Sequence, residues 1–197
     1  RSAQIMKKLI STLYGMLMSA FLAVALVPTQ AFSDETCMSP YMAKIVGQED
    51  YVYVWTLGQV GTGDEQDKLV TIAVNPASPH YGTVIGHTSV GGRNEAHHSG
   101  FTDDRHYLWA ATLDTGKIFI FDVHTNPSKP KLHKVITDFT KASGGIVGPH
   151  TTYALPGRMM ISGLSNNQDF GGRTALVEYT NDGTYVATYD MPTDGNL

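Results

Sequence analysis

The sequence has almost no cysteine. Cys37 is the single one among 197 residues, so no disulfide can form within the chain and a disulfide-stapled fold is excluded. The thiolate of Cys37 could bind a soft atom, or the residue could be a small buried side chain. CxxC pairs, HExxH motifs, glycine-rich phosphate loops and serine nucleophile elbows are also missing, which argues against the enzyme classes that those motifs mark.

Basic side chains are scarce as well. Lys and Arg number 14 against 18 Asp and Glu, and the formal net charge is −4. No cluster of Lys or Arg offsets this balance. Because nucleic acids and anionic membrane surfaces attract clustered positive charge, neither is expected as a partner of the mature protein.

Long apolar runs are missing except near the N-terminus. A positive start at Met6 is followed by an apolar run over residues 15–27 and by a small-residue cleavage site at Ala31. This layout predicts a secretory signal peptide within residues 1–31, with residues 1–5 upstream of the true start. A membrane anchor is the alternative, but the run is shorter than the ~20 residues that a spanning helix needs. The short, lysine-led signal suits export to a bacterial periplasm.

Helical periodicity is rare after residue 31, where short runs rich in Val, Thr and Tyr alternate with turn residues. Such runs predict β-strands. The predicted strands are 51–57, 69–74, 82–88, 108–113, 117–123, 158–164, 174–179 and 185–189. A single helical turn is predicted over residues 136–142.

The strand pattern repeats. Segments 54–57, 110–113 and 161–164 recur at spacings of 56 and 51 residues. A period near 50 residues with about four strands in each unit predicts the blades of a β-propeller, and an ordinary β-sandwich is the alternative. About three blades fit in residues 32–197, whereas propellers close with 4–8 blades. We therefore interpret residues 32–197 as the N-terminal part of an all-β propeller domain, truncated at its C-terminus.

Two histidines occupy equivalent positions in consecutive repeats. His98 and His150 begin segments 98–110 and 150–162, which align without a gap. Stacked repeats bring equivalent positions together near the axis, so these imidazoles are expected to converge just ahead of the strands predicted to be innermost, 108–113 and 158–164. Neutral imidazole binds copper, zinc, iron or nickel. The pattern predicts a metal site that includes His97, the neighbour of His98, although a pair of surface-loop histidines is the alternative.

His97 and His98 are consecutive, and consecutive residues of a regular strand face opposite ways. They can share one metal ion only where the backbone is irregular, which the glycines around them permit. Gly148 and Pro149 similarly favour a loop, rather than a paired strand, that presents His150.

Other polar residues accompany the histidines. Glu95 could orient a ligand imidazole or accept a proton, and it could equally be a solvated loop carboxylate. Arg93 could hold an anion or pair with Glu95, although a plain surface arginine is the simpler interpretation. The repeat offset places Met42 at the equivalent point of the first unit, where packing is the simpler role. The remaining histidines are interpreted as structural: His80, His87, His106, His124 and His133.

Several short segments together resemble the selenium-binding protein family. They are 37–41, 95–100, 118–123, 129–134 and 148–151. The likeness extends in order over essentially all of the sequence after residue 31, and it matches only the N-terminal part of a family member.

The resemblance implies a seven-bladed propeller and a periplasmic copper enzyme. Exported bacterial members of the family oxidise methanethiol with dioxygen and water to formaldehyde, hydrogen sulfide and hydrogen peroxide. The copper-binding histidines of the family carry over to His97, His98 and His150. A further family histidine near the C-terminus has no counterpart here, so this chain alone is expected to be inactive. The cysteine segment that names the mammalian selenium-binding proteins has no match either, so selenium binding does not carry over.

The chemistry of the residues agrees with copper. Oxidation of a thiol by dioxygen needs one-electron steps, for which zinc has no redox couple, whereas copper favours imidazole and soft sulfur. Glu95 or a water would take a proton from the methyl carbon. Three alternatives remain: a four-histidine non-haem iron oxygenase, a periplasmic selenium- or metal-binding propeller without turnover, and an interaction scaffold.

Overall fold

The computed structural model describes residues 39–166 and 171–192. The predicted signal peptide and Cys37 lie outside the described residues. Within the described part, the chain forms three antiparallel sheets and a single one-turn helix. The all-β prediction is confirmed, and the number of sheets agrees with the predicted number of blades. The helix in the described ranges is not long and apolar enough to cross a membrane.

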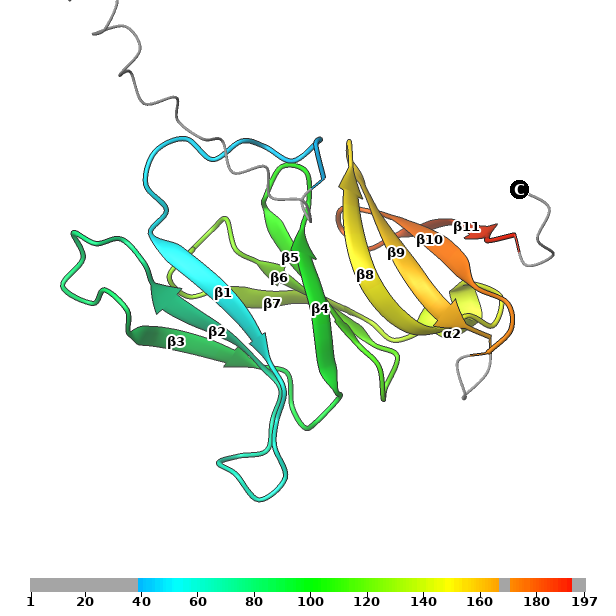
Figure 1. The fold of residues 1–197 in the computed structure, drawn as a ribbon, viewed down its shortest axis with the longest axis horizontal. Helices are drawn as coiled ribbons and strands as arrows, with labels where there is room; N and C mark the ends of the chain where they lie inside the picture. Colours follow the sequence, from blue (N-terminus) through cyan, green and yellow to red (C-terminus); the bar gives the residue numbers. More distant parts are fainter. Residues whose placement is uncertain (1–38, 167–170, 193–197) are drawn as a thin grey trace, which may run out of the picture. The chain divides into compact units, whose positions relative to one another are not determined.

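The sheets follow one another along the sequence (Figure 1). The first has the order β1-β2-β3, with β1 at Tyr51–Thr56, β2 at Lys68–Ala73 and β3 at Val84–Ser89. The second has the order β4-β5-β6-β7, with β4 at Ala96–Phe101, β5 at Tyr107–Thr112, β6 at Ile118–Asp122 and β7 at Lys131–Ile136. The third has the order β11-β10-β9-β8, with β8 at Val147–Leu155, β9 at Arg158–Ser165, β10 at Ala175–Thr180 and β11 at Tyr185–Asp190.

The two central strands of the second sheet, β5 and β6, are buried on both faces, and this explains their continuous apolar sequence. Leu108 and Ala110 of β5 belong to a core cluster with Leu69 of the first sheet. Trp109, which points the other way, belongs to a second cluster with Ile161 of the third sheet. By contrast, β2, β9 and β10 alternate buried and half-buried residues because one face of each is covered. Face-to-face packing of consecutive sheets is the arrangement of propeller blades.

The first strands of consecutive sheets contact one another, in addition to the side-chain packing of the two core clusters. β1 contacts β4, and β4 contacts β8 (Figure 1). This differs from the sequence prediction, which placed the innermost strands at residues 108–113 and 158–164. Those residues form β5 and β9, the second strands of their sheets.

Three strands were not predicted from the sequence: β4, β7 and β8. The predicted loop before His150 is part of β8, which pairs with β9 over most of its length. The predicted helical turn over residues 136–142 is present in shorter form as α2, Phe139–Ala142, between β7 and β8. Phe139 is fully buried and anchors this turn against the second core cluster.

Candidate metal centre

Three histidines from two sheets converge. His97 and His98 lie on β4 and His150 lies on β8. The Nε2 atoms of His97 and His150 are 2.9 Å apart, and the ring of His98 lies 4.6 Å from that of His97 and 4.2 Å from that of His150, centroid to centroid. One ring nitrogen from each residue lies within 4.8 Å of the others. Among the described residues, no other group of three His, Cys, Asp or Glu side chains meets this criterion.

A β-bulge explains how consecutive residues contribute to one cluster. Ala96 pairs with Thr112 and Ser99 pairs with Ala110, so His97 and His98 together oppose the single residue Ala111. Two residues against one is the definition of a β-bulge, which bends the strand and redirects its side chains. The irregular backbone that the sequence analysis required is therefore present within β4.

The third histidine lies on an equivalent bulge. Pro149 pairs with Gly163 and Thr152 pairs with Ile161, so His150 and Thr151 oppose the single residue Ser162. The N–H of Thr151 donates to the hydroxyl of Ser162 at 3.0 Å.

Comparison of the two bulges corrects the sequence alignment. His150 is the first residue of its bulge, as is His97, so these two are equivalent; the gap-free alignment of His98 with His150 was wrong by one residue. The alignment failed because the connection between β4 and β5, residues 102–106, is longer than the connection between β8 and β9, residues 156–157.

Close approach of β4 and β8 brings the imidazoles together. A Cβ atom added to Gly100 of β4 would lie 2.3 Å from the hydroxyl oxygen of Thr152 on β8. Such a distance is far inside van der Waals contact, so a larger residue here would require Thr152 to turn its hydroxyl away or the two strands to separate.

The cluster favours neutral imidazoles. Partial desolvation among the neighbouring rings lowers the pKa of His98, although its side chain is exposed, and the neighbouring His97 lowers it further. Burial also lowers the pKa of His150, with contributions from His98 and His97. Neutral imidazole is the form that coordinates metal ions, because the proton of imidazolium occupies the lone pair that would bind the metal.

Carboxylates flank the histidines on one side. Glu95 adopts a positive φ of 62°, which is uncommon for a residue other than glycine. A hydrogen bond with Asp114 raises the pKa of Glu95, as do burial and the charge of Asp114, while Arg93 and His97 oppose this. Arg93 pairs with Asp114 at 3.2 Å. The sequence offered Glu95 as one possible partner of Arg93 and did not point to Asp114.

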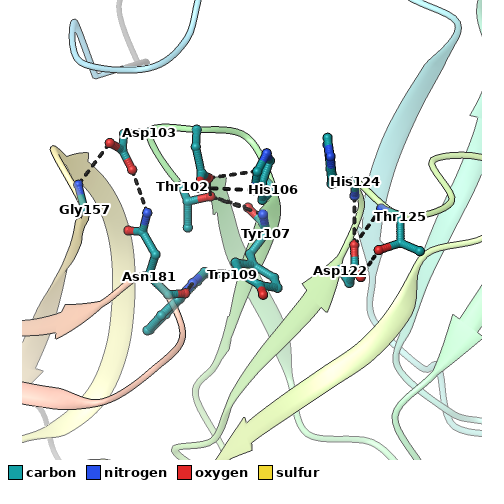
Figure 2. Close-up of polar contacts among 11 residues, drawn as sticks. Thr102, Asp103, His106, Tyr107, Trp109, Asp122, His124, Thr125, Gly157 and Asn181 are labelled. Atoms are coloured by element: carbon teal, nitrogen blue, oxygen red, sulfur yellow. Dashed lines mark hydrogen bonds and ion pairs between the residues drawn. The ribbon is translucent and has the colours of Figure 1, made fainter.

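The other residues considered from the sequence lie apart from this cluster. Met42 packs against the core cluster between the second and third sheets, in agreement with a packing role. The rings of His106 and His124 stack with their centroids 3.9 Å apart, and both side chains are labelled in Figure 2. His133 stacks on Tyr107.

Comparison with known proteins gives one family. Residues 31–189 match the model of the 56 kDa selenium binding protein (SBP56) family. A methanethiol oxidase of Ruegeria pomeroyi is 66% identical over 184 residues, which are 93% of this chain and 42% of the relative. A methanethiol oxidase of Hyphomicrobium is 60% identical over 166 residues, 83% of this chain and 38% of the relative. The chain thus spans about two fifths of the length of these relatives.

More distant relatives belong to the same family. Selenium-binding protein 2 of Arabidopsis thaliana is 30% identical over 175 residues, covering 81% of this chain and 35% of the relative. The X-ray structure of a hypothetical selenium-binding protein from Sulfolobus tokodaii matches with a TM-score of 0.59 and 24% identity, covering 77% of this chain and 37% of that one. At this identity the structural match establishes a shared fold.

Proposed function

The chain belongs to the 56 kDa selenium binding protein family, and we propose that the protein is a periplasmic, copper-dependent methanethiol oxidase. The proposal takes its activity from the bacterial relatives named methanethiol oxidase, at 66% and 60% identity. We propose further that the three sheets are three blades of a seven-bladed ring, since the chain spans about two fifths of those relatives.

The observation that carries the copper proposal is the meeting of His97, His98 and His150. Three ring nitrogens lie within 4.8 Å of one another, and partial desolvation favours the neutral forms of His98 and His150. This donor set fits copper, for which imidazole is a preferred ligand. When bound, copper would supply a one-electron redox couple and an affinity for sulfur. A histidine from a later blade would complete the set.

The proposed reaction balances with three small molecules. Methanethiol, dioxygen and water give formaldehyde, hydrogen sulfide and hydrogen peroxide. The methyl carbon loses two electrons and its bond to sulfur, and water supplies the oxygen of formaldehyde. Dioxygen gains two electrons and two protons, and sulfur leaves as hydrogen sulfide. We propose that the Glu95 carboxylate accepts the proton lost from the methyl carbon, because it directly precedes β4 and its raised pKa suits a proton acceptor.

Product and metal measurements on the full-length protein test this function. Supplied with methanethiol, the protein should consume oxygen and release hydrogen sulfide and formaldehyde, and elemental analysis should find copper. Copper without turnover would favour a binding protein, and iron in place of copper would favour the non-haem oxygenase. Either result contradicts the proposal.

The role of Glu95 has its own test. Glu95→Gln in the full-length protein should lower kcat by about 10²–10⁴, the usual contribution of a positioned acid or base, while copper content stays the same. Unchanged turnover would remove Glu95 from the reaction.

A further inference from the structure

The segment that leads into β4 is tied to the first sheet by one buried carboxylate. Asp67 directly precedes β2 and is fully buried. Its Oδ1 accepts the N–H of Gly58 at 2.7 Å, and its Oδ2 accepts the N–H of Asn94 at 2.9 Å. Its backbone N–H donates to the carbonyl of Gly92, and its carbonyl accepts the N–H of Val90. Both the side chain and the main chain of Asp67 therefore hold the strand-entry segment, residues 90–94.

Asn94 is held from the other side as well. It is buried, with 2% of its surface exposed. Its side-chain N–H donates to the carbonyl of Gly92 at 3.2 Å, and its Oδ1 accepts the hydroxyl of Thr115 at 3.1 Å. Asn94 stands three residues before His97, so its position decides where the chain enters the bulge that carries both histidines of β4.

A carboxylate is the side chain that this position requires. The ion pairs of the described residues include none to Asp67, so its burial is compensated by N–H donors alone. Burying a charged group without a cation is costly. Asparagine in its place would offer one acceptor oxygen, and its NH₂ group would face one of the two N–H donors. Only the carboxylate can accept from Gly58 and Asn94 together.

We propose that Asp67 is a positioning residue for His97 and His98, which it holds in place through Asn94. The inference rests on the proposed copper centre, because these two histidines are the ligands that it would orient. Mutation of a residue that orients a metal ligand without touching the ion typically lowers metal affinity by about 10–100-fold. Asp67 acts across two sheets, so the first sheet has a part in shaping a centre built on the second and third.

Copper binding by variants of the full-length protein tests the proposal. Asp67→Asn should weaken the affinity for Cu(II), measured against a competing chelator, by about 10–100-fold. The electron paramagnetic resonance spectrum of the remaining Cu(II) site should also change. Asp122→Asn is the matched control, because Asp122 likewise accepts two backbone N–H groups, those of His124 and Thr125. It contacts none of the three histidines, so its affinity and spectrum should be those of the wild type.

A second readout does not depend on copper. In metal-free protein labelled at histidine, Asp67→Asn should shift the ring-nitrogen resonances of His97 and His98, and Asp122→Asn should not. If the wild type binds no copper, the proposed copper centre fails, while these resonances still decide the role of Asp67. A folded Asp67→Asn variant with wild-type resonances and wild-type copper affinity would overturn it.

A milder variant covers the case in which Asp67→Asn does not fold. Thr115 is exposed, and Thr115→Val removes the hydroxyl that donates to Asn94. The same histidine resonances should shift by a smaller amount. If these resonances do not shift, the contacts of Asn94 do not determine where β4 lies, and the proposal is wrong.

Discussion

His97 and His150 face each other through Nε2 atoms 2.9 Å apart. Two neutral imidazoles make this contact only when one of the two nitrogens carries hydrogen and the other accepts it. A metal ion bound by both nitrogens must displace that hydrogen, because a protonated ring nitrogen has no free lone pair.

Removal of one imidazole should abolish tight copper binding. In the full-length protein, His98→Ala should weaken copper affinity by on the order of 100-fold or more, since losing a ligand exceeds the loss of an orienting partner. His106→Ala is the control, because His106 stacks on His124 and contacts none of the three histidines. Elemental analysis after gel filtration measures the outcome. Equal copper in the two variants would exclude His98 as a ligand.

Asp103 joins the second sheet to the third through the two hydrogen bonds drawn in Figure 2. It accepts the side-chain N–H of Asn181 at 2.7 Å and the backbone N–H of Gly157 at 3.0 Å. Burial raises the pKa of Asp103, but these hydrogen bonds outweigh burial and the net shift is downward. Because the folded pKa lies below the unfolded one, the ionised carboxylate stabilises the folded protein.

The resulting stability depends on pH in one direction. It is fully present above the unfolded pKa of about 3.9 and is lost as pH falls through the lower folded pKa. Asp103→Asn should therefore destabilise the full-length protein by about 1 kcal/mol at pH 6, an ordinary hydrogen-bond contribution. The difference from wild type should shrink below pH 4. Urea midpoints at several pH values measure this, and a difference that grows on acidification would contradict the assignment.

At the scale of elements, the equivalent bulges of β4 and β8 place the three histidines of the candidate site. The sequence showed that His97 and His98 needed irregular backbone to share a site. It did not reveal that both segments are strands, with β4 paired to β5 and β8 paired to β9. Gly100 in β4 and Gly148 and Pro149 in β8 are poor strand formers, and their presence concealed both strands. β7 was missed for another reason, because Lys131–Ile136 is exposed over half its length and lacks a clear apolar alternation.

The fold class was predictable because the strands that build the core keep short, strand-forming runs of Val, Ile, Phe, Thr and Tyr between turn residues. Whether His97 or His98 is the equivalent of His150 could not be predicted, because the answer depends on strand-pairing register and on turn length. Asp67 gave no sequence signal at all. Its role depends on hydrogen bonds to Gly58 and Asn94, nine and 27 residues away along the chain.

The close contact between β4 and β8 predicts the effect of one methyl group. Gly100→Ala in the full-length protein should displace Thr152 of β8, whose hydroxyl the added Cβ atom would meet, with a cost of up to about 1–3 kcal/mol typical of overpacking. His150 should then move away from His97, so copper affinity should fall together with stability. Gly86→Ala in β3 is the control, because its Cβ would meet a carbonyl oxygen at an ordinary 3.5 Å. Unchanged copper affinity in Gly100→Ala would show that the strand spacing does not shape the site.

At the scale of the whole molecule, the three sheets differ in how they are covered. Both faces of the central strands β5 and β6 of the second sheet are buried. The first sheet leaves Val52 and Val54 of β1 and Val84 of β3 exposed. The third sheet has a shallow apolar groove of about 390 Å³, lined by Tyr153, Leu155, Thr151, Met160, Ser162 and Leu176. Apolar faces of this kind at both ends of a stack are suited to packing against further blades.

The uncovered faces predict how the 197-residue chain behaves when it is produced alone. Its outer sheets would expose apolar side chains and open strand edges to water, so we expect self-association or a molten state. Binding of a hydrophobic fluorescent dye should exceed that of the full-length protein severalfold, and light scattering should show particles larger than a monomer. Replacing Tyr153 and Leu176 by Ser on the outer face of the third sheet should reduce both signals. A monomeric chain that binds no dye and melts in one sharp, cooperative transition would show that these three sheets are stable without further blades.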